Sequence, residues 1–142
     1  MFPIRRLQHS FFSFACAVFL LGLSLPGQAE TPQQILNSYQ DAARTQAAGF
    51  SASSGRGGEF FRAKHGKDWS CSSCHTNDPT ATGKHIVTGK TIQPMAVAAN
   101  PERLTRPEKV EKWLTRNCKD VVGRECTAAE KADVLAFLIA GK

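Results

Sequence analysis

Apolar residues recur at helical spacing in three segments of this chain, and a pair of phenylalanines marks a fourth, short helix. Because positions three and four apart share one helix face, these patterns predict an all-α fold with no strand of note. Capping boxes of the form Thr-x-x-Glu/Gln begin at Thr31, Thr105 and Thr127 and predict three helix starts. The apolar positions are Ile35, Leu36, Tyr39, Ala42 and Ala43; Phe60 and Phe61; Val110, Trp113 and Leu114; and Ala128, Ala132, Leu135 and Ile139.

Two segments lack a helical period. Residues 47–58 are small, polar and rich in Gly and Ser, which predicts a linker or turn before the short helix. Gly57 would let another helix approach closely, and Phe137 in the last helix is available to pack there. Residues 76–106 contain three prolines and two glycines, so we expect an irregular segment that could wrap a bound group and be ordered by it.

The first 29 residues have the pattern of a secretory signal peptide. Arg5 and Arg6 precede an apolar run, 11–25, which is short for a membrane span, and Gly27-Gln28-Ala29 offers small residues for cleavage. We therefore predict a leader, 1–29, and one mature domain, 30–142, in the periplasm of a bacterium. An uncleaved anchor is the alternative, but we expect no stable membrane insertion after cleavage.

The charge of the chain narrows the choice of partner. The net charge of +6 falls to +4 without the leader, because two arginines and no acidic residue are lost with it. So mild an excess is not the footprint of nucleic-acid binding. It fits solubility or weak docking to an acidic redox partner.

The stretch Cys71-Ser72-Ser73-Cys74-His75 carries the clearest chemistry. Two thiols two residues apart, followed at once by His, form the attachment signature of c-type haem, with His75 as the proximal iron ligand. A zinc site would need a second close pair of ligands, and a thioredoxin-like pair would need strands around it. A plain disulfide between Cys71 and Cys74 would leave His75 unexplained.

Four residues are candidates for the opposite side of the iron: His65, His85, Met95 and Asn117. The two histidines lie close to the attachment motif in sequence, so spacing leaves Met95 and Asn117 in contention. With Met95 as the distal ligand the protein would be an ordinary electron carrier, because a thioether ligand raises the reduction potential of the haem. Asn117 is the one polar residue on an apolar helix face, where an unpaired amide would cost about 1–3 kcal/mol.

Cys118 and Cys126 are the remaining cysteines of the mature chain, and in an oxidising compartment we expect them to pair. A loop this short contributes about 2–3 kcal/mol in the loop-entropy model. The bridge would also fix the end of the helix that bears Asn117.

Several blocks of the sequence resemble the sphaeroides haem protein family, a group of high-spin monohaem cytochromes c. The most specific block joins Arg116-Asn117-Cys118 to Gly123-Arg124-Glu125-Cys126. The similarity extends over most of the mature chain, and its other blocks are Arg56-Gly57 with Phe60-Phe61, the haem motif, Thr88-Gly89-Lys90, 100–105, 110–114 and 130–133.

The resemblance implies a class I cytochrome c fold around one covalent haem c. It implies that Asn117 is a weak sixth iron ligand that leaves on reduction, and that Cys118 and Cys126 form a disulfide. It further implies binding of oxygen or nitric oxide, and electron delivery by a dihaem cytochrome c or a membrane cytochrome b. A plain electron carrier with His75/Met95 ligation remains the alternative, and the sequence places no general acid or base.

Overall fold

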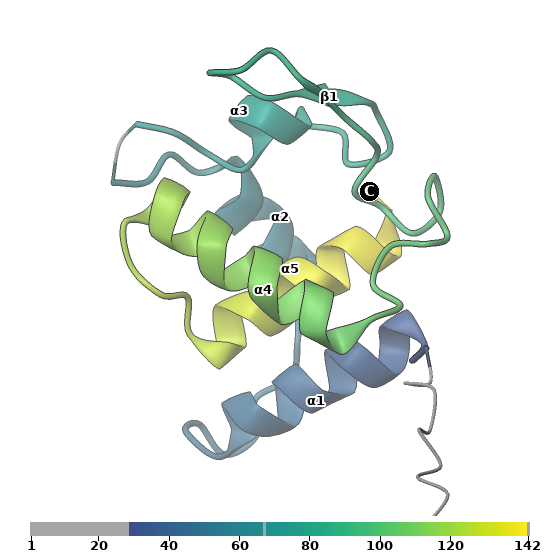
Figure 1. Cartoon of the computed structure of the whole chain (residues 1–142). Coiled ribbons are helices and arrows are strands. Elements are labelled where there is room, and N and C mark those ends of the chain that lie inside the picture. The colour runs from purple at the N-terminus through teal and green to yellow at the C-terminus, as the bar shows by residue number, and fades with distance from the viewer. Residues whose placement is uncertain (1–28, 67, 142) are drawn as a thin grey trace, which may run out of the picture.

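Capping boxes at Thr31 and Thr127 start the two longest helices of the computed structural model, which describes residues 29–66 and 68–141 (Figure 1). Helix α1 (Pro32–Arg44) and helix α5 (Ala128–Ala140) each have a Thr hydroxyl that accepts the N3 backbone N–H, while the N3 side chain accepts the N-cap N–H. Gly141, in the left-handed region, ends α5. Both predicted boxes are confirmed. The predicted leader lies almost wholly outside the described residues.

Helix α2 (Ser54–Arg62) begins earlier than the predicted linker allows. Ser53 caps it, so the Gly/Ser-rich segment supplies its first five residues, 54–58. The expected close approach at Gly57 is confirmed, because a Cβ there would lie 1.9 Å from the backbone oxygen of Asp133 on α5. The rings of Phe61 and Phe137 also meet across this crossing, with centroids 5.2 Å apart.

Helix α4 (Pro107–Asn117) continues into one π-helical turn, η1 (Cys118–Val122), which Gly123 ends at a φ of 80°. The predicted capping box at Thr105 is wrong. Its hydroxyl donates to the backbone oxygen of Glu102, and Arg106 becomes the N-cap without a side-chain bond. A disulfide joins Cys118 to Cys126 and so ties η1 to the start of α5.

The irregular segment contains one short hairpin that the sequence pattern did not predict. Strands β1 (Gly83–Lys84) and β2 (Thr91–Ile92) pair antiparallel, with Gly83 opposite Ile92. The hairpin lies directly against the short helix α3 (Ser72–His75), since a Cβ at Gly83 would lie 2.2 Å from the backbone oxygen of Cys74.

Two apolar clusters hold the helices together. One joins α1, α4 and α5 through Ile35, Leu36, Val110, Ala132 and Leu135, and the other joins α2 and α5 through Phe61, Val134, Phe137 and Leu138. Two residues that were predicted to lie on apolar helix faces, Ala42 and Trp113, are exposed. None of the described helices is long and apolar enough to cross a membrane.

Candidate haem site

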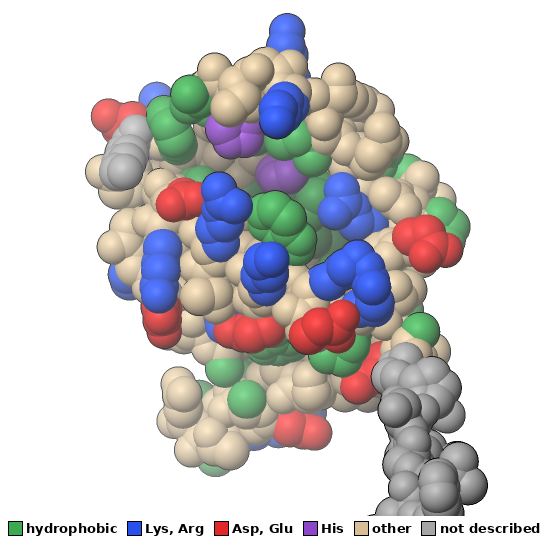
Figure 2. All heavy atoms as spheres, viewed as in Figure 1, with side chains coloured by type: hydrophobic (Ala, Val, Ile, Leu, Met, Phe, Trp, Pro, Cys, Tyr) green, Lys and Arg blue, Asp and Glu red, His purple; other side chains and the backbone are tan. Residues whose placement is uncertain are grey.

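One large cavity is lined by α3 with its hairpin and by α4 and α5. Figure 1 shows how these elements are arranged, and Figure 2 shows the hollow in the surface. Its volume is about 1500 Å³. The structure brings most of the predicted site residues to its wall, namely Cys71, Cys74, His75, His85, Met95, Asn117, Cys118 and Cys126. His65 is not on this wall. Its Nε2 lies 3.0 Å from the backbone oxygen of Phe60, and its ring is tilted by 42° to the Phe60 ring, with centroids 4.6 Å apart.

Helix α3 presents both free thiols of the motif on one turn. The backbone N–H groups of Cys74 and His75 both donate to the oxygen of Cys71, at 3.2 and 3.1 Å, which closes that turn. The N–H of Ile86 in the hairpin donates to Cys74 Sγ at 3.4 Å and fixes the second sulfur. Burial raises the pKa of the Cys71 thiol to about 11, so this thiol is neutral near pH 7.

His75 is held as a neutral imidazole beside the cavity. Burial lowers its pKa to about 4, and the charges of Arg103 and His85 act in the same direction. Its Nδ1 is fully buried and has no hydrogen-bond partner among the described residues. A neutral imidazole has the lone pair that a metal ligand needs.

Asn117 lies at the end of α4, on a different part of the cavity wall from α3. Its side chain is half-buried and makes no hydrogen bond to another described residue. The amide therefore does not cap the end of the helix. The disulfide at Cys118 follows directly and anchors this end of the helix.

Met95 lines the same cavity, and its backbone is hydrogen-bonded to Pro79. Its backbone N–H and that of Ala96 both donate to the oxygen of Pro79, four residues after His75. Its side chain packs on the cluster formed by Phe61 and its neighbours. Met95 therefore contributes an apolar side chain to the cavity wall.

Arg103 is a wall residue that the sequence analysis did not single out. Its guanidinium donates to the backbone oxygens of Pro94 and Gln93, each at 3.0 Å, and no carboxylate lies within 4 Å of it among the described residues. Burial lowers its pKa. An arginine in an irregular segment is a weak sequence signal, and only the fold shows that Arg103 reaches the cavity.

The residues of this site fit a covalently attached haem. Two thiols stand on one turn, a neutral imidazole with an unpartnered ring nitrogen follows them, and the cavity is large enough for a macrocycle. The wall also carries apolar groups from every surrounding element, as a porphyrin face requires.

Comparison with known proteins agrees with this fit. The domain of unknown function DUF1924 matches residues 45–138. Cytochrome c-type protein SHP of Cereibacter sphaeroides is 43% identical over 85% of this chain and 92% of its own length. Cytochrome c'' of Methylophilus methylotrophus is 46% identical over 56% of this chain, and the match spans 55% of that relative.

Solved structures show the same relationship in three dimensions. The structure of oxidized SHP, described as an oxygen binding cytochrome c, aligns with a TM-score of 0.70 at 41% identity, covering 79% of this chain and 98% of that one. Oxidized cytochrome c'' from Methylophilus methylotrophus aligns with a TM-score of 0.71 at 35% identity, covering 78% and 94%.

The fold and the cavity therefore define a helical monohaem cytochrome c, which carries a single covalently bound haem c. The chain belongs to the DUF1924 family, and it resembles cytochrome c-type protein SHP in sequence.

Proposed function

We propose that this protein is a periplasmic cytochrome c that accepts electrons from another cytochrome and binds small diatomic ligands at a gated iron. Cys71 and Cys74 would hold the haem through thioethers, and His75 would be its proximal ligand. The haem supplies a one-electron couple and an iron with one exchangeable position.

The observation that carries this proposal is the environment of Asn117. Its half-buried amide lies on the wall of the His75 cavity and has no partner among the described residues. A macrocycle in the cavity would cover this amide, and an unpartnered amide that is fully buried costs about 1–3 kcal/mol, so a ligand for it inside the cavity is favoured. We assign Asn117 as the distal ligand and Met95 to the apolar wall.

The chemistry of an amide accounts for gating. An amide oxygen is a hard, weak donor that suits a ferric centre better than a ferrous one. Asn117 would therefore bind in the oxidised protein and leave when one electron is added. The released amide could then hydrogen-bond a diatomic ligand, which is how a polar distal group tunes ligand choice. SHP, the similar protein, is itself described as oxygen binding.

The flanking disulfide has a positioning role in this scheme. Cys118 follows Asn117 directly, and its bridge to Cys126 holds the helix end against the start of α5. The covalent bond itself limits how far the end of α4 can drift when Asn117 is released. Separately, the short closed loop stabilises the fold by about 2–3 kcal/mol in the loop-entropy model. A dihaem cytochrome c or a membrane cytochrome b would supply the electron.

Optical spectra of the purified holoprotein test the assignment. We expect a high-spin ferrous spectrum and fast binding of carbon monoxide. Asn117→Ala should change the ferric spectrum to that of an open or water-ligated iron, because its amide is the ligand removed. Met95→Leu, which nearly conserves side-chain volume, is the matched control and should leave both spectra unchanged.

The rival is a plain electron carrier with His75/Met95 ligation. It predicts a low-spin iron in both oxidation states and little binding of carbon monoxide. A thioether-to-iron charge-transfer band that disappears in Met95→Leu and persists in Asn117→Ala would overturn our assignment.

A further inference from the structure

Trp113 is the large apolar residue of α4 that packs on neither apolar cluster of the described residues. Val110 belongs to the cluster that joins α1, α4 and α5, and Leu114 packs on it. Trp113 is instead 49% exposed and lines the haem cavity. Single exposed apolar residues are normal on a protein surface, but this one borders a space that a macrocycle would fill. Its free surface is therefore available to whatever binds in that cavity.

Trp113 lies one helical turn before Asn117 on the same face of α4. Residues four apart on a helix have Cβ atoms about 5–6 Å apart. Helical side chains also lean toward the N-terminus of their helix, so the Asn117 amide leans over the turn that begins at Trp113. Leu114, three residues before Asn117, packs toward α1 and α5. Helix geometry therefore places the amide between Leu114 on the core side and Trp113 on the exposed side.

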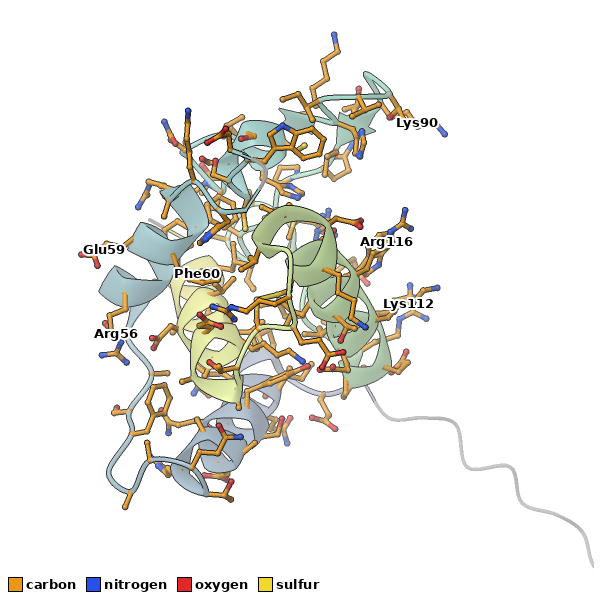
Figure 3. All side chains as sticks on the ribbon, turned by 90° about the vertical axis from the view of Figure 1, so that its left-hand side faces the viewer. Arg56, Glu59, Phe60, Lys90, Lys112 and Arg116 are labelled. Carbon is orange, nitrogen blue, oxygen red and sulfur yellow. A yellow bond between two sulfur atoms is a disulfide. The ribbon has the colours of Figure 1, made fainter. Side chains whose placement is uncertain are left out.

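Arg116 covers one face of the Trp113 ring. Its guanidinium carbon lies 5.7 Å from the ring centroid, within the distance of about 6 Å that a cation–π contact requires. The same guanidinium is 3.6 Å from the carboxylate of Asp120 on η1. Figure 3 shows Arg116 and Lys112 extending from α4 on the side away from α5. Arg116 therefore restrains the indole at the exposed edge of the cavity.

We propose that Trp113 sets the size limit for ligands on the distal side of the haem. The inference rests on the proposed function, because it assumes that a ligand takes the iron position that Asn117 leaves. Steric access to the distal pocket decides which ligands a haem protein binds. A ligand of two atoms fits where one amide group has moved away, whereas a branched ligand must also displace the indole. Trp113 would therefore select diatomic molecules against larger ones.

The hairpin offers a matched comparison for Trp113. Ile86 and Val87 are 52% and 69% exposed and line the same cavity. They belong to the hairpin that packs on α3, the helix that carries His75, and not to the helix that carries Asn117. If any exposed apolar side chain on the wall limited ligand size, Val87 would do so as well as Trp113.

The test compares two ligands of different size, carbon monoxide and tert-butyl isocyanide, on the reduced holoprotein. Both are neutral and bind ferrous haem end-on through carbon, so the ratio of their dissociation constants reports the steric difference between them. The ratio is measured by optical titration for the wild type, Trp113→Ala and Trp113→Phe, which keeps an aromatic ring. The control is Val87→Ala, which truncates the exposed apolar residue of the hairpin.

We expect the wild type to bind carbon monoxide far more tightly than the isocyanide. One methylene group in a packed pocket changes discrimination by about 10- to 200-fold, so Trp113→Ala should reduce the preference for carbon monoxide by at least about 10-fold. The change should lie in the isocyanide affinity, because carbon monoxide does not need the space that the indole occupies. Trp113→Phe should restore most of the preference, and Val87→Ala should leave it unchanged.

A second measurement follows the indole itself. The chain has two tryptophans, Trp69 and Trp113, and both line the cavity. The two ferrous complexes are diamagnetic, so both indole N–H signals can be observed by NMR, and Trp113→Phe assigns them. Exchange of carbon monoxide for saturating isocyanide should move the Trp113 signal and leave that of Trp69, two residues before Cys71, in place. This comparison uses the wild type, so it decides the proposal even where Trp113→Ala is unstable.

Three results would overturn the proposal: an unchanged ligand preference in Trp113→Ala, an equal change in Val87→Ala, or a Trp113 signal that stays in place. Failure of the reduced wild type to bind carbon monoxide would instead reject the proposed function. The role of Trp113 is then decided on the oxidised protein with imidazole and the larger phenylimidazole. Trp113→Ala should improve binding of phenylimidazole relative to imidazole, and an unchanged relative affinity would overturn the proposal there too.

Discussion

Gly57 illustrates how a single residue sets the packing of two helices. Its hydrogen side chain lets α2 lie against the backbone of Asp133 on α5. The same contact brings Arg56 onto the Asp133 carboxylate at 2.7 and 2.8 Å, and that carboxylate also accepts the N–H of Ser53, the α2 N-cap. The glycine and the ion pair thus fix one crossing, from which Phe61 reaches the ring of His75 with centroids 6.2 Å apart.

Gly57→Ala should destabilise the holoprotein strongly. The added Cβ would lie 1.9 Å from a backbone oxygen, so the helices must separate, at a cost of about 3 kcal/mol in the free energy of unfolding. Gly55→Ala is the matched control in the same helix, since its Cβ meets only the Ser53 hydroxyl at 3.6 Å. It should be neutral or stabilise by about 0.5–1 kcal/mol through the unfolded chain. Urea unfolding followed by circular dichroism measures both, and equal effects would contradict the packing argument.

At the scale of elements, the sequence predicted the helix starts that depend on contacts between residues close in the chain. The helices that start at Thr31 and Thr127 follow from their own caps. The box at Thr105 misleads because Leu104 adopts a φ of 57°, which turns the chain and aims the Thr105 hydroxyl backward. The start of α2 was missed because the packing of its glycines on α5 outweighs their poor helix propensity.

The same distinction between local and long-range contacts applies to the residues of the haem site. Cys71, Cys74 and His75 lie within five consecutive residues, so the sequence alone predicts that they form one group. Met95 and Asn117 both reach the cavity, and spacing alone could not separate them. Their surroundings differ only in the folded chain, where the Met95 backbone N–H donates to the oxygen of Pro79 and the Asn117 amide has no partner among the described residues.

Helix α4 depends on a polar network as well as on its apolar face. Glu111 accepts hydrogen bonds from Tyr39 on α1, Lys131 on α5 and Thr115, at 2.6–2.8 Å. The Lys131 bond, followed by the Tyr39 bond, lowers the pKa of Glu111 to about 2, while burial and the Glu111 carboxylate raise the pKa of Tyr39. The ionised carboxylate therefore joins three helices, including the one that bears Asn117.

Glu111→Gln should lower the free energy of unfolding by about 1 kcal/mol at pH 7, a value reduced for solvent screening because the carboxylate side chain is 51% exposed. Since the folded pKa lies below the ordinary value of 4.5, this stabilisation is complete above pH 4.5 and is lost as the pH falls toward 2. The variant and the wild type should therefore converge in acid. Glu108→Gln, an exposed position on the same helix, should show no such convergence in urea titrations at pH 7, 4 and 3.

At the scale of the whole molecule, the elements around the haem cavity fall into two groups. Some pack directly on one another, and the others mainly face the cavity. Helices α1, α2 and α5 pack directly through the two apolar clusters. Helix α4 contributes Val110 to one cluster, while much of its length faces the cavity, and the hairpin packs on α3. A bound macrocycle would complete the core between these two groups of elements.

Cys71→Ala/Cys74→Ala, which removes both attachment points, should therefore unfold the molecule unevenly. Hydrogen exchange followed by mass spectrometry should show lost protection in the hairpin and α4, because their apolar faces would border a cavity of about 1500 Å³. Peptides from α5 and α1 should keep part of their protection through their shared cluster. Ser72→Ala, between the two thiols, is the control and should retain the haem and full protection. Uniform loss across all helices, or none, would show that α4 and the hairpin do not depend on the haem more than the other helices do.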